Sequence, residues 1–172
     1  MVIFGVLCLN FIYVHSENFF SSTDIYANGI SPEPRTNPSL AVDSSGKILY
    51  LFGGHSKYNF LNDLWTFNLE TLMWNFVYAQ DNSPSNIKIG PRSNSVSFFR
   101  KKTQEFCIFG GKSDISMLND FWCFSLLFTS WRSFEYPTFL LSQRFKARYL
   151  EYNDTENLVI IPVDFDGINI FM

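Results

Sequence analysis

The residues of this chain that could do chemistry are few and lie far apart. The sequence contains two histidines, His15 and His55. His55 follows a diglycine and has no cysteine, histidine or acidic residue nearby at a metal-binding spacing, so we interpret it as a solvated loop histidine. Asp164 and Asp166 alternate on a short segment, which is consistent with a turn and insufficient for acid/base catalysis without a partner group. Because the sequence also lacks a phosphate loop, a nucleophile elbow and a paired-histidine helix, it predicts a protein that is not an enzyme.

The cysteines carry no recognisable site either. Cys8, Cys107 and Cys123 have no metal-binding spacing and form no disulfide framework. Cys107 and Cys123 are expected on neighbouring strands, where we interpret them as small buried hydrophobic residues. The sequence therefore predicts neither a metal nor a cofactor.

The composition indicates a globular β protein that is rich in aromatic residues. The chain has 172 residues, of which 47% are hydrophobic and 19% aromatic, and its formal net charge is −3. The run Arg100-Lys101-Lys102 falls in an expected turn between two strands, where a short charge run is usually solvated. No nucleic-acid partner is expected, and the apolar residues 1–14 are too few to span a bilayer.

A repeat organises the rest of the chain. Four landmarks of one copy recur when 57 is added to their residue numbers, and a fixed period of this size is typical of stacked supersecondary units. The landmarks are Pro34-Arg35, Gly53-Gly54, Asn62-Asp63 and Trp74 in the first copy, and Pro91-Arg92, Gly110-Gly111, Asn119-Asp120 and Trp131 in the second.

Each copy is expected to contain four short antiparallel strands. In the first copy, residues 39–42 and 48–52 are apolar runs separated by the turn formers 43–47, which predicts a hairpin. Residues 64–67 and 73–77 form the second pair. The run 48–52 is apolar continuously, so both of its faces need cover, and stacking between sheets supplies that cover.

The landmarks are interpreted as structural. The diglycines are expected where a strand leaves the sheet, because glycine accepts a positive φ and allows a neighbouring backbone to approach. The Asn-Asp pairs are expected just before a strand, as turn caps that bond local backbone amides rather than as catalytic acids. The tryptophans are expected to pack between sheets. They are Trp65, Trp74, Trp122 and Trp131.

Taken together, these landmarks resemble the kelch repeat over about residues 34–142. The resemblance implies an all-β fold, a kelch-type β-propeller whose four-stranded antiparallel blades surround a central channel. It also implies a scaffold or adaptor that binds proteins. The alternative is a fragment of a larger kelch-containing enzyme, or of a secreted galactose-oxidase-like protein, whose catalytic residues lie outside this chain. A copper-radical oxidase of that type needs several histidine and tyrosine ligands, and the repeats contain one histidine.

The repeats are expected at residues 34–90 and 91–143, with a partial, degenerate repeat at 144–172. The third copy begins at Arg144, but Pro162-Val163 stands where the diglycine should be. A propeller needs about four to eight blades of roughly 50 residues each. We therefore expect an incomplete ring, which belongs to a longer propeller or to a truncated gene product.

Residues 1–33 allow two interpretations. The apolar stretch that ends at residues 14–16 fits a signal peptide and implies secretion, although it carries no Lys or Arg at its start. Residues 10–14 also resemble residues 62–66, so a degenerate blade remnant fits as well. With the remnant the chain is expected to be cytoplasmic, and with the signal peptide of residues 1–16 it is expected to be secreted.

A protein partner is expected to bind one face of the blades. The connections between second and third strands, 55–60 and 112–117, emerge on the same face as residues 78–90 between the copies. We expect these connections to be the long ones, and long loops on a rigid scaffold usually carry recognition. Exposed aromatic residues supply binding energy, although packing beside the blade edge is an equal alternative for them. The expected partner-binding residues are Tyr58, Phe60 and Tyr78, with His55 in the same loop.

Overall fold

The computed structural model describes residues 27, 29–77 and 88–134, together with the backbone of residues 147–152 and 157–162. These residues form ten β-strands and no helix, so the described part of the chain has no helix that could cross a membrane. The all-β fold class is confirmed.

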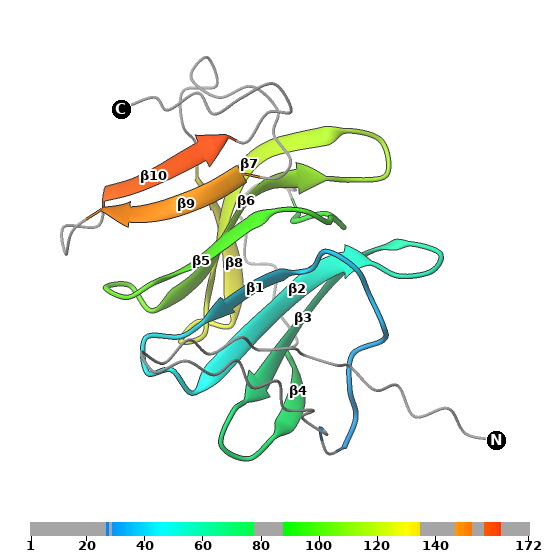
Figure 1. The fold of residues 1–172 in the computed structure, drawn as a ribbon, viewed down its shortest axis with the longest axis vertical. Coiled ribbons are helices and arrows are strands. Elements are labelled where there is room, and N and C mark those ends of the chain that lie inside the picture. The colour runs from blue at the N-terminus through cyan, green and yellow to red at the C-terminus, as the bar shows by residue number, and fades with distance from the viewer. Residues whose placement is uncertain (1–26, 28, 78–87, 135–146, 153–156, 163–172) are drawn as a thin grey trace, which may run out of the picture.

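The first sheet corresponds to the first sequence repeat. Its strands are antiparallel and lie in sequence order, as Figure 1 shows. They are β1 (Ser39–Val42), β2 (Ile48–His55), β3 (Phe60–Asn68) and β4 (Met73–Val77).

The second sheet repeats this arrangement with the same strand order and the same antiparallel pairing. Its strands are β5 (Val96–Arg100), β6 (Glu105–Lys112), β7 (Met117–Ser125) and β8 (Ser130–Phe134). A separate antiparallel hairpin follows, made of β9 (Ala147–Tyr152) and β10 (Asn157–Pro162).

The diglycine of the first repeat lies inside β2 rather than at its exit. Gly53 and Gly54 have φ values of 60° and 100°, and the pairing of β2 with β3 shifts register between Phe52 and Gly54. A Cβ atom on Gly53 would lie 2.5 Å from the carbonyl oxygen of Arg92 in the second repeat. Glycine is therefore required both for its positive φ and for close approach of a neighbour. The expectation that the strand ends here is wrong, because a β-bulge absorbs the two glycines and lets the strand continue.

The two sheets stack face to face around a shared aromatic core. The rings of Phe52 and Trp131 approach to 5.0 Å between centroids, and those of Tyr50 and Phe106 to 5.3 Å. The buried residues of this core are Tyr50, Phe52 and Leu64 from the first sheet and Phe106, Ile108, Trp122, Phe124 and Trp131 from the second.

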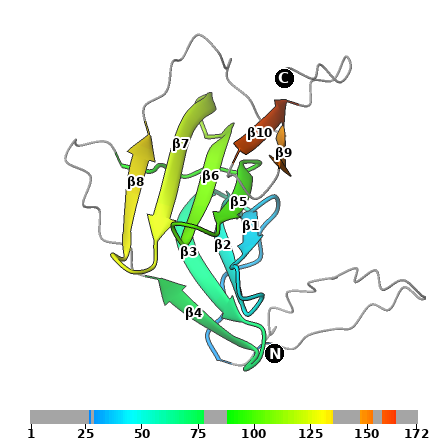
Figure 2. The same ribbon diagram turned by 90° about the vertical axis from the view of Figure 1, so that its left-hand side faces the viewer.

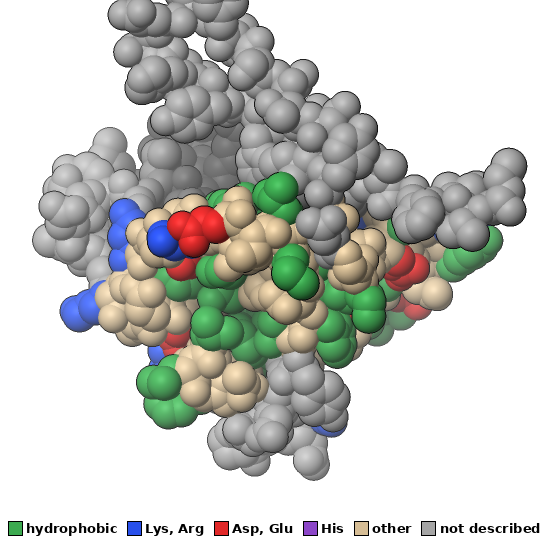
Figure 3. Space-filling model, turned by 90° about the horizontal axis from the view of Figure 1, so that it is seen from below, with side chains coloured by type: hydrophobic (Ala, Val, Ile, Leu, Met, Phe, Trp, Pro, Cys, Tyr) green, Lys and Arg blue, Asp and Glu red, His purple; other side chains and the backbone are tan. Residues whose placement is uncertain are grey.

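The other face of the first sheet is also apolar. Alternate residues of the same strands point there and form a second buried cluster, which contains Leu49, Leu51, Trp65, Phe67 and Trp74. Figure 3 looks at the first sheet from the side away from the second sheet, and apolar side chains extend across the middle of that view. The continuous apolar character of β2 thus reflects burial on both faces.

The first strands of the units lie side by side. Ser97 on β5 donates a hydrogen bond from its hydroxyl to the carbonyl of Leu40 on β1 at 2.7 Å, and its hydroxyl oxygen accepts one from the Leu40 amide at 2.9 Å. β9 in turn lies beside β5, as Figure 2 shows. The described strands thus form an arc of stacked sheets, and this arc does not close into a ring.

Candidate functional site

The face expected to bind a partner is formed by two tight hairpins. His55 pairs with Phe60 across the end of β2 and β3, so the connection spans only residues 56–59. Lys112 pairs with Met117 in the same way in the second sheet. For these two connections the prediction of a long loop is wrong, because both strands continue through the diglycine bulge. Most of the third expected connection, 78–90, lies outside the described residues. Both hairpins lie on the right in Figure 1.

Each hairpin is braced by a serine at its first position. The hydroxyl of Ser56 accepts a hydrogen bond from the amide of Asn59 at 3.2 Å, and the Ser56 amide donates to the Asn59 carbonyl at 2.9 Å. Ser113 makes the equivalent bonds to Ser116, at 3.1 Å and 2.8 Å. These serine turns replace the regular ladder at the tip, so the hairpin ends are held in a defined conformation.

The tip of each hairpin carries a large apolar side chain that contacts water. Tyr58 is 76% exposed and Ile115 is 92% exposed. The two positions are equivalent at the repeat offset of 57. The Lys57 ammonium lies 5.1 Å from the centre of the Tyr58 ring. Tyr58 was expected at the binding face from its residue type, whereas Ile115 was not, although the repeat offset was sufficient to find it.

The remaining expected anchors are placed differently. The rings of His55 and Phe60 meet edge to face at 4.6 Å, and both side chains are half-buried. His55 is the last residue of β2, and its backbone amide and carbonyl both bond Thr36 at 2.9 Å. The interpretation of His55 as a loop histidine is therefore wrong. Tyr78 lies outside the described residues.

Behind the first hairpin, an arginine clamp joins the start of the repeat to β3. The guanidinium of Arg35 donates to both carboxylate oxygens of Asp63, at 2.5 Å and 2.8 Å, and to the carbonyl of Gly53 at 3.0 Å. The indole N–H of Trp65 donates to the same carboxylate at 2.6 Å. Asp63 lies within β3, so the prediction that it caps a turn before a strand is wrong. The strand starts at Phe60, and Arg35 supplies the partner that a carboxylate inside a sheet requires.

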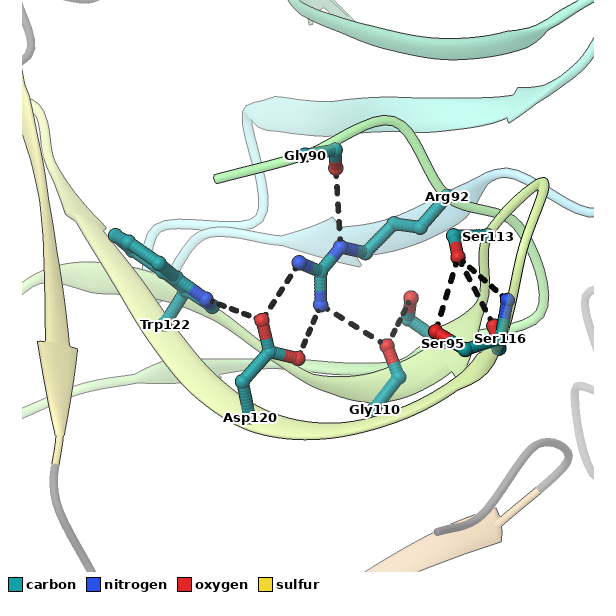
Figure 4. Close-up of polar contacts among 8 residues, drawn as sticks. All are labelled: Gly90, Arg92, Ser95, Gly110, Ser113, Ser116, Asp120 and Trp122. Carbon is teal, nitrogen blue, oxygen red and sulfur yellow. Dashed lines mark hydrogen bonds and ion pairs between the residues drawn. The ribbon is translucent and has the colours of Figure 1, made fainter. Parts of the chain in front are cut away.

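The second repeat contains the same clamp, which Figure 4 shows in close-up. Arg92 donates to Asp120 at 2.5 Å and 2.7 Å and to the Gly110 carbonyl at 3.1 Å, while the Trp122 indole donates to Asp120 at 2.7 Å. The Arg92 side chain is 2% exposed. The aspartate of each Asn-Asp pair thus binds an arginine in both repeats.

Arg92 also connects the two sheets through its backbone. Its amide donates to the carbonyl of Leu61 at 3.0 Å, and its carbonyl accepts from the amide of Gly54 at 2.8 Å. The backbone of Arg92 therefore bonds the β2 bulge of the first sheet, while its side chain is bonded within the second sheet. The clamp positions the two hairpin tips relative to each other.

The electrostatics of the first clamp favour the ionised carboxylate. Burial would raise the pKa of Asp63, but the hydrogen bonds from Arg35 and Trp65 outweigh it and lower the pKa below its usual value. The carboxylate accepts three N–H groups, two from Arg35 and one from Trp65, so we interpret it as a structural anchor.

The sequence of the repeats is similar to that of known proteins. The chain matches the family model described as the KLHDC2/KLHL20/DRC7 Kelch-repeats domain over residues 5–160. The chain belongs to the kelch-repeat family. A stretch of 52 residues is also 44% identical to Tip elongation aberrant protein 3 of Schizosaccharomyces pombe (strain 972 / ATCC 24843), covering 30% of this chain and 4% of that protein. The kelch resemblance is confirmed, and protein binding is a general function of the family.

This kelch-repeat chain also contains a disulfide that the sequence analysis did not expect. Cys107 and Cys123 are bonded, with 4.1 Å between their Cα atoms. They lie directly opposite each other in the register of β6 and β7. Both residues are buried, as expected, but the expectation that they form no disulfide is wrong. The sequence placed them on neighbouring strands, but bonding depends on the register, which a spacing does not give. Cys8 lies outside the described residues.

A buried carboxylate adjoins this disulfide. A carboxylate oxygen of Glu105 lies within 4.8 Å of both sulfur atoms. These three atoms are close enough to hold a metal ion if the cysteines were reduced. Burial would raise the pKa of Glu105, but the hydrogen bond from Arg132 and the nearby Arg100 charge lower it. The Arg132 guanidinium lies 2.7 Å from the Glu105 carboxylate. The carboxylate is thus already neutralised by arginine, and both sulfur atoms are used in the disulfide.

Proposed function

We propose that this chain is a protein-interaction module that binds a protein partner through the β2–β3 and β6–β7 hairpins. The observation that carries the proposal is the pair Tyr58 and Ile115, which are 76% and 92% exposed at equivalent tips. Large apolar side chains at such positions gain from burial against a partner. The tips are held by serine turns and by the arginine clamps, so binding orders few side chains and loses little conformational entropy.

The proposal assigns no catalysis to this chain. The carboxylate of Asp63 is occupied by an arginine and an indole, and Asp120 is bonded in the same way. His55 packs against Phe60. The alternative, a fragment of a larger kelch-containing enzyme, requires catalytic groups outside this chain.

The compartment is a separate proposal. We propose a cytoplasmic protein, because the kelch match begins at residue 5 and so runs through most of the stretch that would form a signal peptide. The Cys107–Cys123 disulfide favours the alternative of secretion, because disulfides persist in oxidising compartments. Mass spectrometry of the N-terminal peptide isolated from cells distinguishes the two, since secretion by a signal peptide removes residues up to about 16.

The interaction proposal is tested with two matched double variants. Tyr58→Ser with Ile115→Ser removes both tips of the proposed face, whereas Leu127→Ser with Phe128→Ser removes exposed apolar residues from the opposite face. Proteins recovered by affinity purification with the unaltered chain are quantified against each variant. We expect at least one partner to be lost with the first variant and retained with the second. Equal recovery with both variants, or loss with the second alone, would contradict the proposal.

A further inference from the structure

A second exposed surface lies at the opposite end of the second sheet. The turn between β7 and β8 presents three consecutive apolar residues, Leu126, Leu127 and Phe128, which are 49%, 84% and 69% exposed. The turn between β5 and β6 presents Lys101 and Lys102, both exposed. We call these five residues the turn edge.

The turn edge is one continuous feature rather than two unrelated turns. Glu105 begins β6 directly opposite Ser125, which ends β7. Both turns therefore leave the sheet at the same level on neighbouring strands, on the left in Figure 1.

The first sheet forms the same four-stranded arrangement without apolar residues at two of these turn positions. The positions equivalent to Leu127 and Phe128 are Glu70 and Thr71, at the offset of 57. Glu70 there forms an ion pair with Lys47 at 2.8 Å. The second sheet thus has apolar side chains at two turn positions that are polar in the first sheet, and the neighbouring β5–β6 turn carries two lysines. The third apolar residue, Leu126, is matched by Leu69 in the first sheet, which is partly buried there. Leu127 and Phe128 are 84% and 69% exposed, so packing within the blade gains nothing from them. We infer that these two side chains contact a surface outside the chain.

We propose that the turn edge docks onto an anionic lipid bilayer. Three consecutive apolar residues on one turn can enter a lipid surface together, whereas each hairpin of the proposed protein-binding face carries one exposed large apolar residue. Leucine and phenylalanine side chains enter the interfacial region of a bilayer, and flanking lysines attract acidic headgroups. The formal charge of the chain is −3, so overall charge does not favour such a membrane, and the attraction arises locally at the turn edge.

Flotation of the full chain with lipid vesicles tests this proposal, because vesicles rise in a density gradient and protein aggregates do not. We expect the unaltered chain to rise with phosphatidylcholine vesicles that contain phosphatidylserine, and to rise less with phosphatidylcholine alone. Each lysine near an anionic surface contributes about a fivefold gain in binding, so Lys101→Gln with Lys102→Gln is expected to weaken binding roughly thirtyfold. Leu127→Ser with Phe128→Ser is expected to abolish flotation on both vesicle types.

The control is Tyr58→Ser with Ile115→Ser, which alters exposed apolar residues on the other face and is expected to float like the unaltered chain. All substituted side chains are exposed, so thermal melts are expected to remain unchanged. Flotation that is equal for the control and the turn-edge variants would overturn the proposal. So would failure of the unaltered chain to float with anionic vesicles, including the case in which the edge instead binds an acidic protein. The test is independent of the protein-binding hairpins, because it uses lipid as the only ligand.

Discussion

The two four-stranded sheets are copies of one plan, and their differences show which parts of that plan are fixed. Both contain an arginine clamp with the same partners: Arg35 binds Asp63, and Arg92 binds Asp120. In contrast, the second sheet has the Cys107–Cys123 disulfide at positions that hold Tyr50 and Thr66 in the first. It also has Leu127 and Phe128 in the β7–β8 turn where the first sheet has Glu70 and Thr71. The framework is thus held constant while the tips vary, and recognition is expected at the tips.

The comparison extends to the stacking faces. In the second sheet, Trp122 and Trp131 face the first sheet and join the shared core. Their equivalents Trp65 and Trp74 lie on the opposite side of the first sheet, in a separate cluster. Both four-stranded sheets therefore carry their tryptophans on the same side, and the second sheet stacks its tryptophan side on the first.

The largest effect expected from the comparison is at these tryptophans. Trp122→Ala is expected to cost about 3 to 5 kcal/mol in the free energy of unfolding, as for a fully buried large aromatic. Trp122 is 1% exposed and lies between two described sheets, whereas Trp65 is 9% exposed. Chemical denaturation of both variants checks this, with Trp65→Ala expected to be the milder. Unchanged midpoints for both would show that stacking does not depend on the tryptophans.

The clamps come next in size. Asp63→Ala and Asp120→Ala each leave a buried guanidinium without its carboxylate, which is expected to cost about 3 kcal/mol. The Arg35 and Arg92 side chains are 1% and 2% exposed, so water cannot replace the lost partner. We expect the two variants to have similar urea midpoints. A large effect at one site and none at the other would break the equivalence of the two sheets.

Reduction of the disulfide is expected to have a somewhat smaller effect, and only in the second sheet. The bonded cysteines are 16 residues apart, and a loop of about this length contributes about 3 kcal/mol at most by restricting the unfolded chain. Denaturation with and without dithiothreitol measures it. Cys107→Ala with Cys123→Ala provides the control, because its midpoint is expected to be insensitive to the reductant. A reductant effect that persists in this variant would come from elsewhere in the chain.

The smallest expected effect is the acid sensitivity of the first clamp. The pKa of Asp63 is lower in the folded chain than its ordinary value of 3.8, so the unfolded chain binds the proton more readily. The clamp therefore stabilises the fold fully above about pH 4, and this contribution is lost as the pH falls through the lower folded pKa. Asp63→Asn is expected to flatten the dependence of the urea midpoint on pH below about 4. An unchanged slope would contradict the ionised clamp.

Local patterns predicted the parts of the fold that local residues decide. The strand expected at residues 73–77 is β4, and the first hairpin lies at the predicted turn. In contrast, β3 was predicted to start after Asn62-Asp63, because these residues favour turns. Asp63 is tolerated within the strand by Arg35, which lies 28 residues earlier in the chain. That separation recurs between Arg92 and Asp120, but only the folded structure shows that the residues meet.

The candidate site was predictable only in part for related reasons. Tyr58 was found as an exposed aromatic residue, whereas Phe60 was chosen on the same grounds and packs against His55. The difference depends on where the hairpin closes, and the bulge at Gly53 moves that point outward. Ile115 was missed because isoleucine is not aromatic, although it occupies the equivalent tip. The repeat, rather than the residue type, was the better guide to the exposed face.

The most direct test of the central claim is a titration of a partner recovered by affinity purification against single and double tip variants. If both hairpins bind that partner, Tyr58→Ser and Ile115→Ser are each expected to cost about 2 kcal/mol, or roughly a thirtyfold loss of affinity. The double variant is then expected to lose roughly a thousandfold, because the tips lie on separate sheets and their effects should add. Affinities that stay within error of the unaltered chain for all three variants would show that the hairpin face is not the binding site.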